Sequence, residues 1–431
     1  MNLKEILMSM GLSWTTLIEF VILFFFFFIF NFWFTLILLL AFCGYVGFKV
    51  YLFIKNQKFA YRDNLFNQNL PKSMRAAYYS SSWKKIIDFS EYLLPVIIKG
   101  DELLIKVHSA SLNPMDYKFI YTRIPFYRWL LFPNLGIGKD FSGEVVKVGK
   151  TITKFKVGDN VFGFATMGTF QEYTIAKEQW IHLMPEKVQF NQAACLPLVG
   201  CVSYQALMYF YRNNNNADNI YGELDFEPDL SGKNILVIGA SGGCGHIAIQ
   251  MAKFLNANEV YGVCSNENVD IIKNIGVCED VFAYDSLDFE KTLESVLITK
   301  NDDKKLDLIL DTVSSPEAGD IGKKYLQYLK EDGKYVALNS SSYLKFCAGL
   351  IKSFIPKLNI EKKGAHIHML NRNDSKGLEI LSNMISQGKI TFFINDVFFE
   401  YQAIEEALKI LKSRKTRGKL VCNIIDENII I

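Results

Sequence analysis

The sequence predicts an α/β protein with two domains, one β-rich and one built on a doubly wound parallel sheet, preceded by an N-terminal transmembrane segment. Three observations predict this class. A glycine-rich turn joins an apolar strand to an apolar helix within Asn234–Lys253. Short alternating segments with glycine turns come before it, which is typical of a β-rich domain. An almost continuous apolar run, Phe20–Phe48, precedes both.

The composition limits the functional classes. The chain has 431 residues, enough for two domains and an extra segment, and its net charge is +2. With this balance and no basic stripe, we expect no nucleic-acid partner. The eight cysteines are scattered without a C-x-x-C pair, so the pattern indicates neither a zinc site nor a disulfide framework. It favours reduced thiols in a reducing compartment.

Residues 1–60 are interpreted as a membrane anchor containing the apolar run. As a helix, about 29 residues rise about 43 Å, more than the roughly 30 Å hydrocarbon core of a bilayer. One tilted span and a hairpin broken near Asn31 both explain this length. A cleaved signal peptide fits less well, because its apolar region has only about 7–15 residues. The basic residues after the run predict that the rest of the chain stays on the cytoplasmic side: Lys49, Lys55, Lys58 and Arg62.

Residues 61–195 are expected to form the β-rich domain. Strands are predicted where apolar residues alternate between glycine turns. These segments are Glu102–Ser109, Gly138–Val148, Phe155–Gly163 and Gly168–Ala176, with a loop at Ser111–Lys118. Ala193–Leu207 has helical spacing and leads into the next domain.

Residues 196–345 are expected to form the parallel-sheet domain, and 346–431 to return to the β-rich domain. Strands of the parallel sheet are predicted at Ile235–Ile238, Glu259–Ser265, Val281–Tyr284, Leu306–Thr312 and Gly333–Asn339, with a helix at Val269–Ile275. In the returning segment a strand is predicted at Phe392–Phe399, a helix at Ala403–Leu411 and a last strand at Gly418–Ile425.

The glycine-rich turn has the pattern of a dinucleotide site. Its residues are Gly239, Ser241, Gly242, Gly243 and Gly245. Glycines allow a tight turn and a close approach to a pyrophosphate, and the following helix offers free N–H groups to it. A purely structural glycine turn is the alternative. The next strand lies at the distance expected for ribose binding, which favours the nucleotide.

The end of the strand Glu259–Ser265 bears on the choice between NADH and NADPH. A site for NADH usually has Asp or Glu there, which accepts from the ribose 2′-hydroxyl. Here the end is Cys264-Ser265-Asn266, and these small residues leave room for a 2′-phosphate. NADPH is therefore the expected cofactor. In the alternative interpretation, Glu267 binds the ribose.

Six motifs occur in one order between about Leu93 and Ile425. They are S-L-N-P-M-D, G-K-D-F-S-G-E-V, K-V-G-D-N-V-F-G, A-A-C-L-P-L-V-G-C-V-S-Y-Q-A-L, G-A-S-G-G-C-G-H and R-G-K-L-V. In this order the chain resembles the zinc-independent quinone oxidoreductase branch of the medium-chain dehydrogenase/reductase superfamily. Within that branch it is similar to the chloroplast-envelope quinone oxidoreductase homologues and the reticulon-interacting mitochondrial reductases.

The resemblance implies a fold and an activity. The β-rich domain is expected to be GroES-like and to hold the substrate, and the other domain to be a Rossmann domain that holds NADPH. Members of the family transfer a hydride to a quinone, or to the β-carbon of an enone, in the cleft between the domains. The resemblance also implies a homodimer.

Three catalytic residues are implied: Asn113, Asp116 and Tyr121. Asn113 and Asp116 match positions beside the nicotinamide and the substrate, where Asn113 can donate to an oxygen and Asp116 can orient the loop. A plain N-P-x-D turn is the alternative. Tyr117 and Tyr121 can donate to a carbonyl, as in related alkenal reductases. This chain departs from the family's usual Tyr-x-Arg pattern, so a packing role is the alternative for both tyrosines.

Cofactor contacts are implied as well. Ser203 stands where the family usually has a Thr beside the nicotinamide, and Ser265, Asn268 and Tyr284 match positions near the 2′-phosphate. The basic residue that usually accompanies them is missing. Arg414 or Lys419, from the closing segment, is expected to supply the charge. In the alternative, both are ordinary surface charges.

No metal is expected. Zinc-dependent relatives have a Cys where Asn113 stands and a His-Glu pair where Lys139 and Asp140 stand, and their four-cysteine lobe is missing here. The spacing of His366 and His368 would suit a metal, but a short polar strand explains it better.

The sequence is therefore interpreted as a membrane-anchored, zinc-independent NADPH oxidoreductase that reduces quinones or α,β-unsaturated carbonyls. Anchoring through residues 20–48 of the chain, in contact with the lipid bilayer, favours a lipophilic small-molecule substrate. Two alternatives differ in class. One is a nucleotide-binding scaffold or trafficking factor with weak or no activity. The other is a zinc alcohol dehydrogenase, which the missing ligands argue against.

Overall fold

The computed structural model describes residues 70–79, 87–97, 99–121, 136–165, 168–214, 228–298, 305–315, 318–339, 365–366, 375–399 and 403–425. The chain divides into two compact units, 1–70 and 71–431, and only Leu70 of the first is described. Within the described ranges no helix is long and apolar enough to cross a membrane. The run Phe20–Phe48 lies outside those ranges, so the transmembrane segment stays a prediction.

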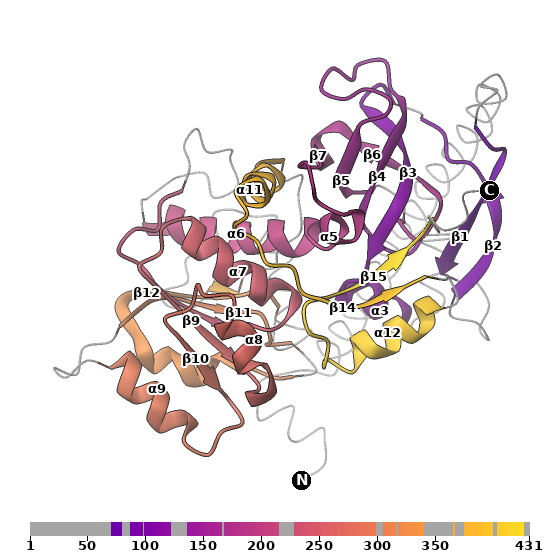
Figure 1. The fold of residues 1–431 in the computed structure, drawn as a ribbon. Helices are drawn as coiled ribbons and strands as arrows, with labels where there is room; N and C mark the ends of the chain where they lie inside the picture. Colours follow the sequence, from indigo (N-terminus) through magenta and orange to yellow (C-terminus); the bar gives the residue numbers. More distant parts are fainter. Residues whose placement is uncertain are drawn as a thin grey trace, which may run out of the picture. The chain divides into compact units, whose positions relative to one another are not determined.

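The β-rich part contains a sheet with the strand order β14-β15-β3-β4-β5-β7, and β6 also pairs with β3 (Figure 1). The bounds are β3 (Glu102–Ser111), β4 (Asp140–Val148), β5 (Asn160–Phe164), β6 (Tyr173–Lys177), β7 (Ile181–Leu183), β14 (Ile394–Phe398) and β15 (Lys419–Asn423). Leu103, Ile105 and Val107 alternate along β3 into one apolar core, because successive side chains of a strand face opposite ways.

Shorter elements surround this sheet. They are the antiparallel hairpin of β1 (Ser73–Tyr79) and β2 (Ile87–Leu93), and the helices α3 (Pro114–Tyr121), η1 (Glu178–Trp180), α5 (Phe190–Ala194) and α12 (Ile404–Lys412). The hairpin is tied to the helix α3, since the Tyr79 hydroxyl donates to the carbonyl oxygen of Asp116 at 3.1 Å. The sequence did not predict this hairpin.

The second sheet has the order β10-β9-β8-β11-β12-β13, and every pairing in it is parallel. Its strands are β8 (Asn234–Ile238), β9 (Glu259–Cys264), β10 (Asp280–Ala283), β11 (Leu306–Asp311), β12 (Leu329–Ala337) and β13 (Ala365–His366). Ile235 and Val237 face one apolar core, whereas Leu236 and Ile238 face another. Both faces of the sheet are therefore covered, as a parallel sheet requires.

The helices of this part supply that cover. They are α6 (Pro197–Asn214), α7 (Gly243–Phe254), η2 (Asn266–Asn268), α8 (Val269–Lys273), α9 (Phe289–Leu297), η3 (Gly322–Tyr328) and α11 (Ser375–Ser386) (Figure 1). The predicted helices at 193–207 and 269–275 correspond to α5 with α6, and to α8.

The chain returns to the β-rich part later than the boundary expected at residue 346. The strand β13 still pairs with β12 in the parallel sheet. The helix α11 also packs its apolar face onto the core of this part. A side chain at Gly200 of α6 would collide with Leu381 of α11, so this glycine permits the close contact. The expected boundary is corrected, and β14 is the first described element of the tail in the other sheet.

Candidate active site

The glycine turn lies between β8 and α7, as the sequence predicts. Gly239 has a φ of +84°, a conformation that favours glycine. A Cβ at Gly245 would collide with the carbonyl oxygen of Gly239, so only glycine lets the helix pass this close to the end of the strand. The predicted strand, turn and helix are confirmed.

The turn fits a phosphate group. Ser241, Gly242 and Gly243 are partly exposed, whereas α7 is buried from Gly245 to Ala252. An added Cβ at Gly242 would meet only the Gly239 carbonyl oxygen, at 3.3 Å, so a ligand can approach the backbone closely. The first N–H groups of a helix have no partner within the helix and carry a partial positive charge. These residues therefore fit the pyrophosphate of a dinucleotide.

Ser203 lies in α6 and is fully buried. Its hydroxyl lies 2.7 Å from the carbonyl oxygen of Val199 and 3.1 Å from that of Cys244, in the first turn of α7. Because a hydroxyl has a single proton, the two carbonyls compete for it. Ser203 thus joins α6 to the glycine helix, and its predicted contact with the nicotinamide stays a prediction.

Ser265, Asn268 and Tyr284 come together where β9 and β10 end. The Asn268 Nδ2 atom donates to Ser265 Oγ at 2.8 Å, and the backbone N–H of Tyr284 donates to the carbonyl oxygen of Cys264 at 3.0 Å. Asn268 is buried, yet its Oδ1 atom meets no donor in the described part of the chain. Buried acceptors normally have a partner, so this end of the site has a place for a ligand donor.

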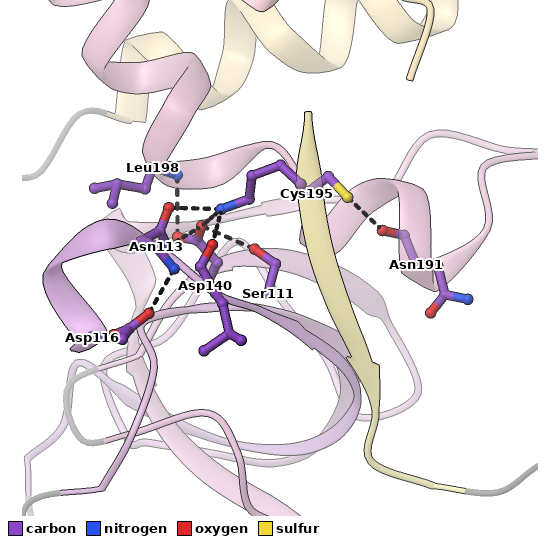
Figure 2. Close-up of polar contacts among 9 residues, drawn as sticks. Ser111, Asn113, Asp116, Asp140, Asn191, Cys195 and Leu198 are labelled. Carbon is purple, nitrogen blue, oxygen red and sulfur yellow. Dashed lines mark hydrogen bonds and ion pairs between the residues drawn. The ribbon is translucent and has the colours of Figure 1, made fainter. Parts of the chain in front are cut away.

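A buried polar network joins the loop after β3 to the strand β15 (Figure 2). The Lys419 ammonium donates to the Leu112 carbonyl oxygen at 2.8 Å and to Asn113 Oδ1 at 2.6 Å. It also lies 3.3 Å from the Oδ2 atom of Asp140. The Asn113 amide donates to that same oxygen at 2.9 Å. Both ends of the Asn113 amide are therefore bonded within the protein.

Asp140 is the acceptor at the centre of this network. Its Oδ2 atom also accepts from the Ser111 hydroxyl at 3.2 Å, and its Oδ1 atom accepts from the backbone N–H of Leu198, in the first turn of α6, at 3.1 Å. Four donors around one carboxyl indicate the ionised form, which only accepts. Burial raises the pKa of Asp140, and the charge of Lys419 with the hydrogen bonds from Asn113 and Ser111 opposes that rise. The carboxylate thus depends on the ammonium.

Asp116 closes the turn that carries Asn113. Its Oδ2 atom accepts from the Asn113 backbone N–H at 2.7 Å, and its own N–H donates to the Asn113 carbonyl oxygen at 2.9 Å. The N-P-x-D segment therefore forms the first turn of the helix α3, and the loop expected at Ser111–Lys118 is helical from Pro114 onward. Burial raises the pKa of Asp116 to about 7, against the opposing hydrogen bond from Asn113. This carboxyl can release a proton near neutral pH.

Of the two tyrosines of α3, the structure describes the side chain of only one. Tyr117 is half-buried and packs against the apolar core of the β-rich part. Tyr121 is the last residue of α3, and its side chain lies outside the part of the chain that the structure describes. The catalytic role of Tyr121 stays a prediction.

The structure places both basic residues of the closing segment that were expected to supply the phosphate charge. Lys419 is 3% exposed, so it is not a surface charge, and its ammonium bonds to the loop after β3 rather than to Ser265 and Asn268. Arg414 donates to the carbonyl oxygen of Val313 at 3.0 Å. The cation that does reach the end of β9 is Arg417, which pairs with Glu267 at 3.2 Å. Only the R-G-K motif marked this residue in the sequence.

The described residues contain no group of three or more His, Cys, Asp or Glu side chains able to hold a metal. His366 lies in β13, where it pairs in the parallel sheet, and His368 lies outside the described residues. The absence of a metal stays a prediction.

Comparisons with known proteins agree with this arrangement. Residues 99–186 match the family model described as an alcohol dehydrogenase GroES-like domain, and residues 278–422 match one described as a zinc-binding dehydrogenase. The chain is 36% identical over 224 residues to a chloroplastic quinone-oxidoreductase homolog of Spinacia oleracea, covering 50% of this chain and 60% of that protein.

Two further proteins cover more of their own length. The mitochondrial NAD(P)H oxidoreductase RTN4IP1 of Homo sapiens is 28% identical over 361 residues, covering 77% of this chain and 84% of that protein. The solved quinone oxidoreductase of Coxiella burnetii is 27% identical with a TM-score of 0.63, covering 82% of this chain and 99% of that one. The chain thus has a GroES-like domain and a Rossmann-like parallel sheet, and the relatives that it resembles are members of the medium-chain dehydrogenase/reductase superfamily.

Proposed function

We propose that this protein is a membrane-anchored NADPH oxidoreductase that transfers a hydride to quinones or α,β-unsaturated carbonyls without zinc. One observation carries the proposal: the consecutive residues Gly418 and Lys419 contact both the glycine turn and the loop of Asn113. The Gly418 N–H donates to the Ser241 carbonyl oxygen in the glycine turn at 2.9 Å. The Lys419 ammonium holds the loop of Asn113. The relatives named for quinone and NAD(P)H oxidoreductases support the reaction class.

The bound nicotinamide would supply the hydride. The residues of this chain would bind the cofactor, orient the substrate and deliver a proton. The glycine turn would bind the pyrophosphate through backbone N–H groups. The loop of Asn113 would be held rigid by Lys419 and Asp140, which favours a fixed substrate geometry. Met115, exposed in the first turn of α3, offers an apolar contact to a lipophilic substrate. Asp116, with its pKa near 7, is the proposed source of the proton.

Zinc independence is supported by the charge at the centre of the network. Asn113 and Asp140 are among the positions at which the resemblance places zinc ligands in other members. Here the Lys419 ammonium already lies against both. A divalent cation at the same oxygens would meet a like charge and acceptors that are already occupied. We therefore expect the purified protein to contain substoichiometric zinc by elemental analysis, and one zinc per chain would refute this part.

The experiment uses the full chain purified in detergent micelles. NADPH oxidation is followed by absorbance with a short-chain quinone and an α,β-unsaturated aldehyde as acceptors. Turnover should fall at least about tenfold in Asn113→Ala, because the loop loses two charge-assisted hydrogen bonds. Asn160→Ala, at an exposed position of β5, is the matched control and should keep wild-type turnover. Nucleotide binding without turnover on either acceptor would instead favour a scaffold.

Two parts of the proposal concern the whole chain. Residues 20–48 would anchor it in a bilayer with the catalytic part on the cytoplasmic side, and protease protection of membrane vesicles checks that orientation. A homodimer, implied by the resemblance, is checked by light scattering of the detergent-solubilised protein.

A further inference from the structure

The end of β9 combines two polar side chains with an ion pair. Ser265 and Asn268 bond to each other there, and the buried Oδ1 atom of Asn268 meets no donor from the described residues. Next to them Glu267 pairs with Arg417, with 3.2 Å between Oε2 and Nη2. An acceptor without a donor and a guanidinium lie together where a nucleotide of this fold places its adenosine ribose.

Arg417 is held in this place from two sides. Its backbone N–H donates to Asn395 Oδ1 at 2.9 Å. The next residue, Gly418, is bridged to Gly242 in the glycine turn. The backbone of Arg417 therefore lies beside the predicted pyrophosphate position, and its side chain extends to the end of β9. A planar guanidinium with several donors is suited to a phosphate group.

The ion pair between Glu267 and the Arg417 guanidinium is weak and can be broken at a small cost in free energy. The Glu267 side chain is 63% exposed. Its carboxylate can therefore rotate away from Arg417 and be solvated by water when an anion that binds Arg417 more strongly is present. Asp285 lies close by, because its carboxylate accepts from the Asn266 N–H at 2.7 Å. A second carboxylate therefore lies beside the residue that precedes Glu267. A 2′-phosphate would gain Arg417 but would also be repelled by the remaining acid.

We propose that Glu267 and Arg417 select the cofactor, with the 2′-phosphate of NADPH displacing Glu267 from Arg417 and NADH leaving the pair closed. This inference rests on the proposed function. It assigns Arg417 as the basic residue that binds the 2′-phosphate, in place of the one that the sequence lacks near Asn268. The ribose 3′-hydroxyl, present in both cofactors, would donate to the Asn268 acceptor. Because Asp285 stays in place, the preference for NADPH is about tenfold rather than absolute.

The test measures the dissociation constants of NADPH and NADH by calorimetry on the full chain in detergent micelles. In Arg417→Gln, NADPH should bind about tenfold more weakly while NADH changes less than about twofold. In Glu267→Gln, NADPH should bind about threefold more tightly, since its intramolecular competitor and one repulsive charge are gone. Lys415→Gln, which removes one exposed charge from the same segment, is the control and should change neither constant.

Each other outcome overturns the inference in a distinct way. Equal weakening of both nucleotides in Arg417→Gln would assign Arg417 to the shared pyrophosphate. Unchanged binding in both variants would leave Glu267 and Arg417 as a surface ion pair without a ligand. Wild-type protein that binds neither nucleotide would refute the proposed function itself. Both residues are exposed, so the variants should fold, and circular dichroism checks that they do.

Discussion

Two ion pairs stand two residues apart at the start of β15, and they differ in almost everything except length. Arg417 and Glu267 are 3.2 Å apart with side chains 44% and 63% exposed. Lys419 and Asp140 are 3.3 Å apart with side chains 3% and 0% exposed. The two pairs therefore differ in interaction energy despite their similar distances, because the surrounding medium sets the strength of a Coulomb interaction.

The comparison separates two uses of charge. Water and salt screen the Arg417 pair, so it costs little to break and can exchange its anion for another. The Lys419 pair is desolvated, so each partner requires the other, and loss of one leaves a bare charge in the interior. The exposed pair suits selection of a ligand, whereas the buried pair suits a fixed loop. The predictions below would break or sharpen this contrast.

The largest effect is expected for Lys419→Met. The substitution leaves Asp140 buried without its ammonium, and the free energy of unfolding should fall by about 3–5 kcal/mol. Denaturant unfolding followed by circular dichroism measures it. Combining Lys419→Met with Asp140→Asn should recover part of the loss, because no charge remains unpaired. A single variant within about 1 kcal/mol of wild type would show that the buried pair behaves like an exposed one.

A second buried charge gives an effect of intermediate size. The pKa of Asp116 rises from 3.8 to about 7 on folding, so its protonated form is favoured in the folded chain. The contribution is fully present below about pH 4 and is lost as pH rises to about 7, on the order of 3 kcal/mol. Asp116→Asn should remove this part of the pH dependence in denaturant unfolding between pH 4 and 7. Parallel curves for the variant and the wild type would contradict the assignment.

The same carboxyl should control the reaction. If protonated Asp116 supplies the proton, turnover falls as pH rises through about 7. Asp116→Asn should be slower and should lack this fall, which steady-state rates measured across the pH range would reveal. A variant that keeps the wild-type profile would exclude Asp116 as the proton source.

The smallest effect is expected for the exposed pair. Glu267→Gln should change the free energy of unfolding by less than about 1 kcal/mol, and added salt should reduce even that change. Unfolding at low and high ionic strength measures it, with Lys419→Met as the salt-insensitive comparison. A large, salt-independent loss in Glu267→Gln would remove the distinction between the two pairs.

Local patterns predicted most of the described fold. The glycine turn, the strand before it and the helix after it follow from their own residues, as do the predicted β-strands of both sheets. The helix α11 was not predicted because no regular hydrophobic spacing was recognised in the sequence between Leu350 and Phe392. The hairpin of β1 and β2 was missed although its strands pair closely with each other, since no turn signal was recognised between them.

The site was less predictable than the fold. Asn113 was placed in the loop after β3, whereas Asp116, expected in the same loop, lies in the helix α3. The Asn113 side chain is held by Lys419, which is 306 residues away. Arg417 likewise meets Glu267 only through the return of the chain. Spacing in a sequence carries no information about such contacts, so the burial of Lys419 and the cation at the end of β9 required the structure.

The position of Gly418 and Lys419 along the chain also has a consequence for synthesis. At roughly 5–20 residues per second, a ribosome needs on the order of half a minute to reach them after Asn113 has been made. Until then the glycine turn lacks its strand partner and the carboxylate of Asp140 lacks its cation. A nascent chain therefore carries both halves of the site without the piece that fixes them, and a cofactor would meet an ordered site only after this segment has emerged.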